Sequence, residues 1–264
     1  MRGPAYYASL DYSRWNRAQR FAQRLIGLFV HATMRVRVEG LERIPATGPA
    51  IIAGNHLSLF DSIVVIPYLP RPVILLLAEE LRVWPWIDFV FGRLGNAIVV
   101  RRGSGERRPV ELGAAVLDAG GIVAVAPEGR RSKTGGLQRG RKGVGRLAVR
   151  TGAPVVPVAI WGQERAIRSW RRLRRAPVEV RFGAPSSFDD RDADTPADAT
   201  TWVMLAIAGL LPREYRGVYA AKAQDDTERG VERPSARERS NALPSLRPSY
   251  HGIAVDFHPA TPDY

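Results

Sequence analysis

The chain of 264 residues contains no cysteine and only four histidines. The absence of cysteine excludes disulfides, thiolate metal sites and a cysteine nucleophile, and it fits a chain that needs no oxidising compartment. A zinc site would also be short of ligands, because two of the histidines, His251 and His258, lie close to the carboxyl end, far from His31 and His56. We therefore expect no metal site and no bound cofactor.

Long apolar runs are missing as well. The first fourteen residues have no apolar core, so we expect no signal peptide. The most hydrophobic early run, 25–33, lies between Arg24 and Arg35 and is far shorter than the ~20 apolar residues that span a bilayer. The sequence therefore predicts no transmembrane helix.

Acidic residues are scarce relative to basic ones. The chain has 26 Asp and Glu against 39 Lys and Arg, which gives a net charge of +13 and a pI near 10.8. Segment 130–175 alone carries fourteen Lys or Arg and a single acid, Glu164. Such a field attracts anions, and charge alone leaves open whether these are nucleic acid, anionic lipid or a phosphorylated substrate.

Hydrophobic periodicity divides the chain into three parts. Over 1–37, apolar residues from position 15 recur at steps of three and four among arginines, which predicts a basic amphipathic helix that either docks on the core or lies at a lipid interface. Over 38–219, short β-branched runs alternate with helical stretches, which predicts an α/β domain. Segment 220–264 has few apolar residues and is expected to be a disordered tail.

The expected elements of the central part follow from these runs. Strands are expected at 50–53, 73–77, 97–100, 122–126, 155–161 and 178–182, and helices at 62–68, 79–91, 109–119, 144–151 and 196–211.

The sharpest local signal directly follows the run 50–53. His56 comes at the expected end of that strand, and Asp61 follows five residues later. If a helix begins near Asp61, its carboxylate can fold back and accept a hydrogen bond from one imidazole nitrogen of His56. The other nitrogen is then left as a general base, so we take these two residues as the candidate catalytic pair.

Three further positions suggest binding of a phosphate. Arg101 ends the expected strand 97–100, and Arg131 follows Glu128 and Gly129 in the turn after 122–126; arginine makes bidentate bonds to phosphate oxygens. Lys142 precedes a helix whose amino terminus favours anions. The alternative interpretation is that Arg101 is a solvated charge at a strand end and that the Glu128 turn holds a local ion pair.

Taken together and in this order, these motifs resemble the glycerolipid acyltransferase superfamily over approximately 38–182. The family motifs are matched by Asn55, His56 and Asp61 (NHxxxxD), by 95–101, by Pro127, Glu128, Gly129, Arg131 and Ser132 (FPEGTRS), and by 155–158. Three positions depart from the family pattern, and they leave the acceptor open: Ala126 and Arg130 replace the usual Phe and Thr, and Glu79 stands where a lysine is frequent.

The resemblance implies a single domain with a mixed, largely parallel central sheet flanked by helices. It also implies transfer of a fatty acyl group from acyl-CoA or acyl carrier protein to the hydroxyl of 1-acylglycerol 3-phosphate, another lysophospholipid or glycerol 3-phosphate. His56 is then the base and Asp61 its partner. The acceptor-binding residues are Arg101, Glu128, Gly129, Arg131, Ser132 and Lys142.

The basic surface then has a use at the cytoplasmic face of the plasma membrane, where the enzyme would sit as a peripheral or monotopic protein on anionic lipid. Segment 165–175 with Trp161 and Trp170 suits the lipid boundary, and the aromatic groups in 84–91 either line an acyl groove, enter the interface or fill the core. Two rival classes stay open, a basic nucleic-acid-binding protein and a membrane-binding module without activity. The first leaves the motifs unexplained, so no nucleic acid is expected as a partner.

Overall fold

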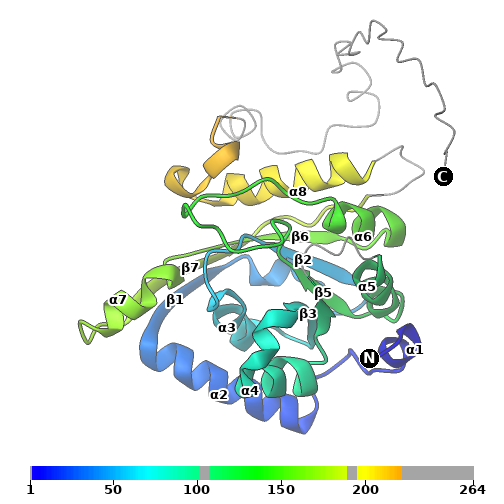
Figure 1. The fold of residues 1–264 in the computed structure, drawn as a ribbon, viewed down its shortest axis with the longest axis horizontal. Helices are drawn as coiled ribbons and strands as arrows, with labels where there is room; N and C mark the ends of the chain where they lie inside the picture. Colours follow the sequence, from blue (N-terminus) through cyan, green and yellow to red (C-terminus); the bar gives the residue numbers. More distant parts are fainter. Residues whose placement is uncertain (1, 102–106, 189–194, 222–264) are drawn as a thin grey trace, which may run out of the picture. The chain divides into compact units, whose positions relative to one another are not determined.

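The structure, a computed structural model, describes residues 2–101, 107–188 and 195–221. Its core is one seven-stranded sheet in the order β1-β7-β6-β2-β5-β3-β4 (Figure 1). All neighbours pair in parallel except β6 and β7, which are antiparallel. The expected α/β fold with a mixed, largely parallel sheet is therefore confirmed.

The strands match the apolar runs of the sequence. They are β1 Met34–Glu39, β2 Ala50–Gly54, β3 Val73–Ala78, β4 Ile98–Val100, β5 Ile122–Val125, β6 Val155–Trp161 and β7 Ala176–Phe182. In β2, four of the five residues are buried, because helices cover both faces of the central parallel strands. Parallel strands bring their carboxyl ends to one edge of the sheet, and there β2, β5, β3 and β4 deliver the segments that begin with Asn55, Ala126, Glu79 and Arg101.

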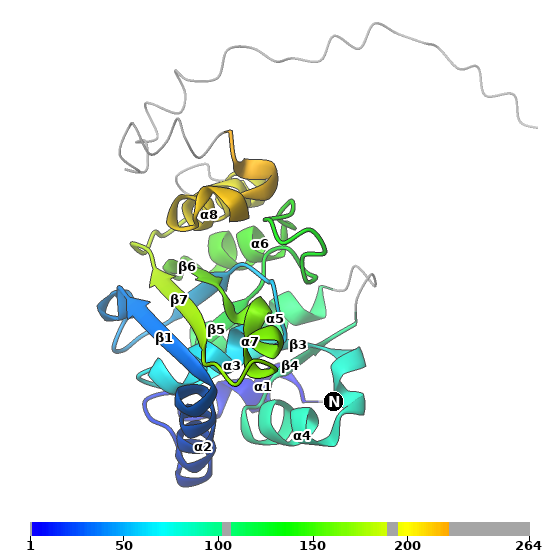
Figure 2. The same cartoon turned by 90° about the vertical axis from the view of Figure 1, so that its left-hand side faces the viewer.

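Helices pack on both faces of the sheet, as Figures 1 and 2 show. On one face, α1 (Pro4–Ala8), α5 (Arg108–Asp118), α6 (Gly143–Thr151) and α8 (Pro196–Leu210) enclose an apolar cluster around Ile51 and Val155. On the other face, α2 (Arg17–Thr33) and α3 (Asp61–Val65) enclose a second cluster around Ile52 and Val156. Successive side chains of β2 and β6 thus point to opposite faces of the sheet and belong to two separate apolar clusters.

The amphipathic helix expected within 1–37 is present as α2, but the segment also contains other elements. Two helices form, α1 and α2, and α2 begins at a capping box in which Asn16 and Gln19 bond each other's backbone N–H. The helix ends at Thr33, and 34–37 instead belong to the edge strand β1, which the sequence analysis missed. These residues form a strand because Val36 and Val38 alternate with charged residues, and an alternation with a period of two favours a strand.

The expected helix 79–91 is also wrong. A 3₁₀ turn (Glu79–Val83), a short helix α4 (Pro85–Ile87) and a π-helical segment (Asp88–Leu94) replace it. Pro85 explains the break, since its ring lacks the N–H and clashes with the preceding turn of a continuous helix. The segment is therefore irregular, and its tryptophans Trp84 and Trp86 are exposed instead of filling the core.

The remaining elements are short. Helix α7 (Ala166–Trp170) follows β6 and leads into β7, and 3₁₀ turns occur at Leu41–Arg43, Ile66–Tyr68, Gln163–Arg165, Arg213–Tyr215 and Gly217–Tyr219. Among the residues that the structure describes, no helix combines the length and apolar character needed to cross a membrane. The predicted tail, 220–264, lies outside the described residues except for its first two.

Candidate active site

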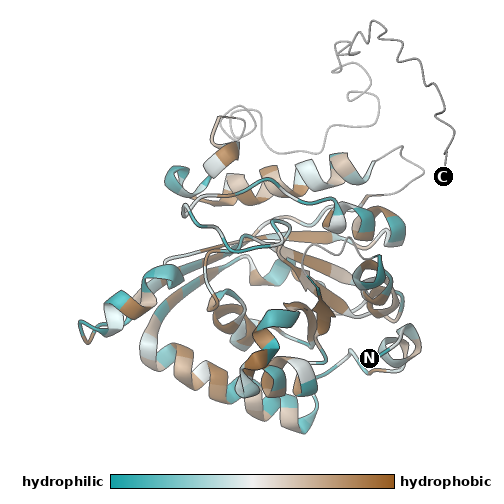
Figure 3. Cartoon of the chain, in the orientation of Figure 1, coloured by the Kyte–Doolittle hydropathy of each residue, from teal (hydrophilic) through white to brown (hydrophobic). Residues whose placement is uncertain are grey.

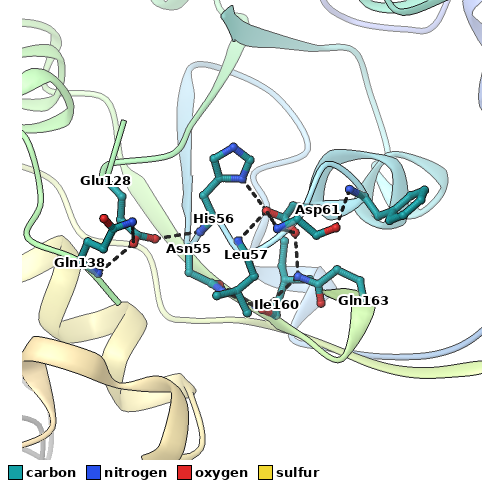
Figure 4. Close-up of polar contacts among 10 residues, drawn as sticks. Asn55, His56, Leu57, Asp61, Glu128, Gln138, Ile160 and Gln163 are labelled. Carbon is teal, nitrogen blue, oxygen red and sulfur yellow. Dashed lines mark hydrogen bonds and ion pairs between the residues drawn. The ribbon is translucent and has the colours of Figure 1, made fainter. Parts of the chain in front are cut away.

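The loop between β2 and α3, named the catalytic loop after this prediction, carries the two residues that the sequence predicts to form the catalytic pair. His56 follows the end of β2, and Asp61 is the first residue of α3, so the loop folds the carboxylate back toward the ring. His56 Nδ1 lies 2.6 Å from Asp61 Oδ2 (Figure 4). The side chain of His56 is 23% exposed and that of Asp61 is 7% exposed. The predicted contact is therefore present, between a buried acid and an imidazole that reaches the surface.

Asp61 is held by donors on every side. Its oxygens accept hydrogen bonds from the backbone N–H of Leu57 at 3.0 Å and of Ser58 at 3.0 and 3.1 Å, and from Gln163 Nε2 at 2.7 Å. A carboxylate surrounded only by donors acts as an acceptor, so Nδ1 of His56 carries the proton in this contact. The second ring nitrogen, Nε2, then has a free lone pair, and Figure 4 shows it directed away from Asp61.

Glu128 links the segment around His56 to the segment around Gln138. It is buried, and its oxygens accept hydrogen bonds from the backbone N–H of His56 at 2.9 Å and of Gln138 at 2.8 Å. Burial raises the pKa of this carboxyl group, and the donors of Gln138 and His56 oppose that rise. Through these bonds Glu128 joins the loops that carry His56 and Gln138, and its contact with the acceptor stays a prediction.

The turn after β5 lies against the catalytic loop. The backbone N–H of Ser132 donates to the carbonyl oxygen of His56 at 2.8 Å, and the Ser132 hydroxyl donates to the carbonyl of Gly136 at 2.6 Å. Gly129 has a φ of 68°, and a Cβ there would lie 2.8 Å from Cδ of Arg141. The positive φ strains a residue with a side chain, and a Cβ would also displace the Arg141 side chain, so glycine suits this turn.

The predicted phosphate contacts lie at differing distances from the pair. Arg131 is exposed in the turn that Ser132 anchors to His56, and Lys142 is exposed at the amino-terminal cap of α6. Arg101 directly follows β4, which is the third strand along the sheet from β2, roughly 14 Å away at the usual strand spacing. It pairs with Glu79 at 2.9 Å, and that hydrogen bond lowers the pKa of the Glu79 carboxyl. The structure thus brings Ser132, with Arg131 beside it in the chain, to the backbone of His56, and it places Arg101 after a strand that is not a neighbour of β2.

Two side-chain contacts that tie the loop of His56 and Asp61 to β6 and the turn after it were not predicted from the sequence. Asn55 donates from Nδ2 to the carbonyl of Ile160 at 2.7 Å and accepts from its N–H at 2.8 Å, which fastens the start of the loop to that strand. Gln163, just beyond β6, donates to Asp61. The asparagine of the NHxxxxD pattern was a signal that could have been used, whereas no motif marks Gln163.

No group of three His, Asp or Glu side chains that could hold a metal occurs among the described residues. The arrangement instead suits proton transfer. An imidazole with its tautomer fixed by a carboxylate takes a proton at Nε2, and the carboxylate stabilises the positive charge that results.

Comparison with known proteins agrees with this geometry. A family model described as Acyltransferase matches residues 35–161. The chain is 29% identical over 131 residues to a protein of Borreliella burgdorferi named 1-acyl-sn-glycerol-3-phosphate acyltransferase, and the match covers 49% of this chain and 52% of the relative. A protein of the same name from Cocos nucifera is 29% identical over 147 residues, with 53% and 47% covered. The chain therefore spans about half the length of these two relatives.

A solved structure shares the fold. The crystal structure of the 1-acyl-sn-glycerophosphate acyltransferase PlsC from Thermotoga maritima superposes with a TM-score of 0.57 at 22% identity, covering 82% of this chain and 80% of that one. The matched family region runs from β1 to the end of β6 and includes His56, Asp61 and the turn at Glu128. The acyltransferase family model therefore matches the part of the chain that holds the candidate catalytic pair, residues 35–161.

Proposed function

We propose that this protein is an O-acyltransferase that moves a fatty acyl group from a thioester donor, acyl-CoA or acyl carrier protein, to the free hydroxyl of 1-acylglycerol 3-phosphate, forming phosphatidate for phospholipid synthesis. The observation that carries the proposal is the 2.6 Å contact of His56 Nδ1 with Asp61, which leaves Nε2 facing outward. The shared name of the relatives supports the choice of acceptor.

The chemical step needs no cofactor. Nε2 of His56 takes the proton of the acceptor hydroxyl while the oxygen attacks the thioester carbonyl carbon. The C–S bond then breaks, and the leaving thiolate takes the proton back from the imidazolium, so that the products are an ester and a free thiol. Asp61 keeps the ring in the reactive tautomer and stabilises its cationic form.

The acceptor would be held by the basic turn beside the pair. Arg131 and Lys142 are exposed cations without an ion pair to any described residue, and Ser132 lies one hydrogen bond from the backbone of His56. A phosphate bound to these groups would place the neighbouring glycerol hydroxyl near Nε2, where positioning lowers the barrier by several kcal/mol. Arg101 could join through its long side chain if the Glu79 ion pair opens.

The test is to incubate the purified protein with acyl-CoA and separate acceptors while free thiol is followed. Lysophosphatidate, glycerol 3-phosphate, lysophosphatidylcholine and a buffer blank form the acceptor panel. The proposal expects thiol release and phosphatidate with lysophosphatidate above all others. Thiol release that is equal in the blank and the full reaction would contradict it.

An exposed apolar surface suits the lipid nature of this acceptor. On α2, the exposed side chains of Phe21 (64% exposed), Leu25, Leu28 (69% exposed) and Phe29 recur at steps of three and four and so share one side of the helix as an apolar stripe. Figure 3 shows that α2 carries hydrophobic segments, coloured brown. Monomeric soluble proteins rarely expose such patches, and arginines on the same helix favour an anionic interface. We infer that this stripe meets the cytoplasmic face of the plasma membrane as a peripheral contact.

The catalytic loop lies next to this stripe. Trp170 of α7 contacts Phe29 of α2, with ring centroids 5.8 Å apart, and Phe60 of the catalytic loop, at 5.2 Å. α7 and the turn after it also expose Arg168, Arg171, Arg172 and Arg174, and each cation near an anionic surface contributes about 1 kcal/mol. Binding through α2 and α7 would therefore bring the membrane-borne acceptor to the pair.

Sedimentation with anionic liposomes tests the membrane contact. Leu28→Asp should reduce the bound fraction severalfold and leave turnover on a short-chain, water-soluble acceptor unchanged, because the Leu28 side chain is 69% exposed and makes none of the hydrogen bonds that hold His56 and Asp61. Equal binding of wild type and variant would contradict the contact. A gel shift with duplex DNA at physiological salt tests the rival class, which expects strong binding to DNA and none to liposomes.

A further inference from the structure

Gln163 is a buried polar residue on the far side of Asp61 from His56. It follows β6 directly, and it is fully buried, with 0% exposure. The turn that aims it inward depends on Gly162, whose φ is 96° and where a Cβ would lie 2.2 Å from the carbonyl oxygen of Pro177. The backbone therefore presents Gln163 to Asp61 at a position where only glycine fits before it.

The amide makes one strong bond and leaves one oxygen unused. Its Nε2 donates to Asp61 Oδ1 at 2.7 Å, with a longer contact of 3.5 Å to the carbonyl of Ile160. Its Oε1 is buried and has no hydrogen-bond partner in the described part of the chain. Turning the amide over would set Oε1 against the carboxylate, two acceptors face to face, so the carboxylate fixes the orientation.

We propose that Gln163 is a positioning residue for acyl transfer, acting through Asp61 on His56; the proposal rests on the function proposed above. The bond from Nε2 fixes the Oδ1 corner of the carboxylate, and the other corner, Oδ2, then points at His56 Nδ1. Leu57 and Ser58 bond the same carboxylate, but from within its own loop. Gln163 ties the carboxylate to the rigid sheet.

The unpaired oxygen argues against a role in stability alone. A buried acceptor without a partner costs folding free energy, whereas an apolar side chain of the same shape would not carry this cost. Gln163 is therefore less favourable for packing than an apolar residue of the same shape, but it supplies a hydrogen bond to Asp61 that an apolar residue cannot. Sites of this kind trade stability for function.

Gln163→Met, which is close in shape and has no donor, separates the two roles. We expect kcat with acyl-CoA and lysophosphatidate to fall about 10- to 100-fold, since a small displacement at a reacting group costs about this much. The KM for lysophosphatidate should stay within error, and the melting temperature should be unchanged or higher. Unchanged kcat would overturn the proposal, as would a fall in kcat that tracks a lower melting temperature.

A double-mutant cycle with Asp61→Asn gives the second readout. Because Gln163 acts through Asp61, the double variant should be no slower than Asp61→Asn alone, whereas independent losses would multiply and overturn the proposal. Gln163→Asn keeps the amide on a shorter stem and should lower kcat as well. Thr200→Val is the matched control: it removes a buried hydroxyl that donates to the carbonyl of Pro196 on α8, and kcat should not change.

The two proposals fail in different ways. Wild-type protein that releases no thiol with any acceptor would overturn the proposed function. Wild-type activity that Gln163→Met and Gln163→Asn both retain in full would leave that function standing and remove Gln163 from it.

Discussion

Replacing Asp61 by asparagine perturbs the site with almost no change of shape. The carboxylate accepts five hydrogen bonds from four residues, at 2.6 to 3.1 Å. An amide offers one oxygen and one NH₂ group, so in either orientation an N–H of Asn meets other donors. The variant therefore tests what the negative charge and the acceptor pattern contribute, separately from packing.

The size of the loss follows from the two orientations of the amide. If its NH₂ faces His56, the imidazole must carry its proton on Nε2 and is lost as a base, an effect that reaches about 10⁴-fold in hydrolases with a comparable pair. If its oxygen faces His56, the tautomer survives and only the charge is lost. A hydrogen bond to a charged group contributes about 1.5 to 3 kcal/mol, which is roughly 10- to 150-fold in rate.

We therefore expect kcat of Asp61→Asn to fall between about 10-fold and 10⁴-fold, measured by thiol release at saturating lysophosphatidate and acyl-CoA. Asp198→Asn serves as control, because that carboxylate caps α8 through Thr195 and should affect stability without affecting kcat. A folded Asp61→Asn protein with wild-type kcat would refute the reasoning.

Two further predictions concern the turn after β5. Arg131→Ala should raise the KM for lysophosphatidate by about tenfold or more with a smaller effect on kcat, because it removes a charge-assisted contact to phosphate; an unchanged KM in steady-state kinetics would exclude that contact. Burial raises the pKa of Glu128 above its usual 4.5, so the folded state holds the proton more tightly than the unfolded state. The stability that this protonation contributes is present at low pH and is lost as pH rises through the raised pKa. The melting temperature of wild type relative to Glu128→Gln should therefore decrease from pH 4.5 upward, and a difference that grows with pH would contradict the raised pKa.

The catalytic loop was predictable because its signals are local. Asn55 and His56 come shortly after the run 50–53, and Asp61, five residues after His56, is the first residue of a helix. Strand, loop and helix therefore follow from residues that are close in the sequence. The motifs at Arg131 and Ser132 were found for the same reason. The contact of Ser132 with the backbone of His56 depends only on parallel neighbours, β2 and β5, that end at the same edge of the sheet.

The positions that were missed depend on contacts distant in sequence. Gln163 reaches Asp61 across 102 positions, and Glu128 reaches the backbone of His56 across 72, so no short pattern reveals either bond. The burial of Glu128 was missed for the same reason, because a carboxylate among arginines resembles an exposed residue until its contacts are known. The edge strand β1 was lost for a different reason, since it continues directly from α2 without a turn.

The most direct test is the turnover of His56→Ala with lysophosphatidate and acyl-CoA. The melting temperature of this variant should equal that of wild type, so that a loss of turnover reflects the missing imidazole. Since a positioned general base contributes about 10²- to 10⁴-fold, the account predicts a loss of kcat in that range or beyond. Turnover close to that of wild type would show that Nε2 of His56 does not take the proton of the acceptor.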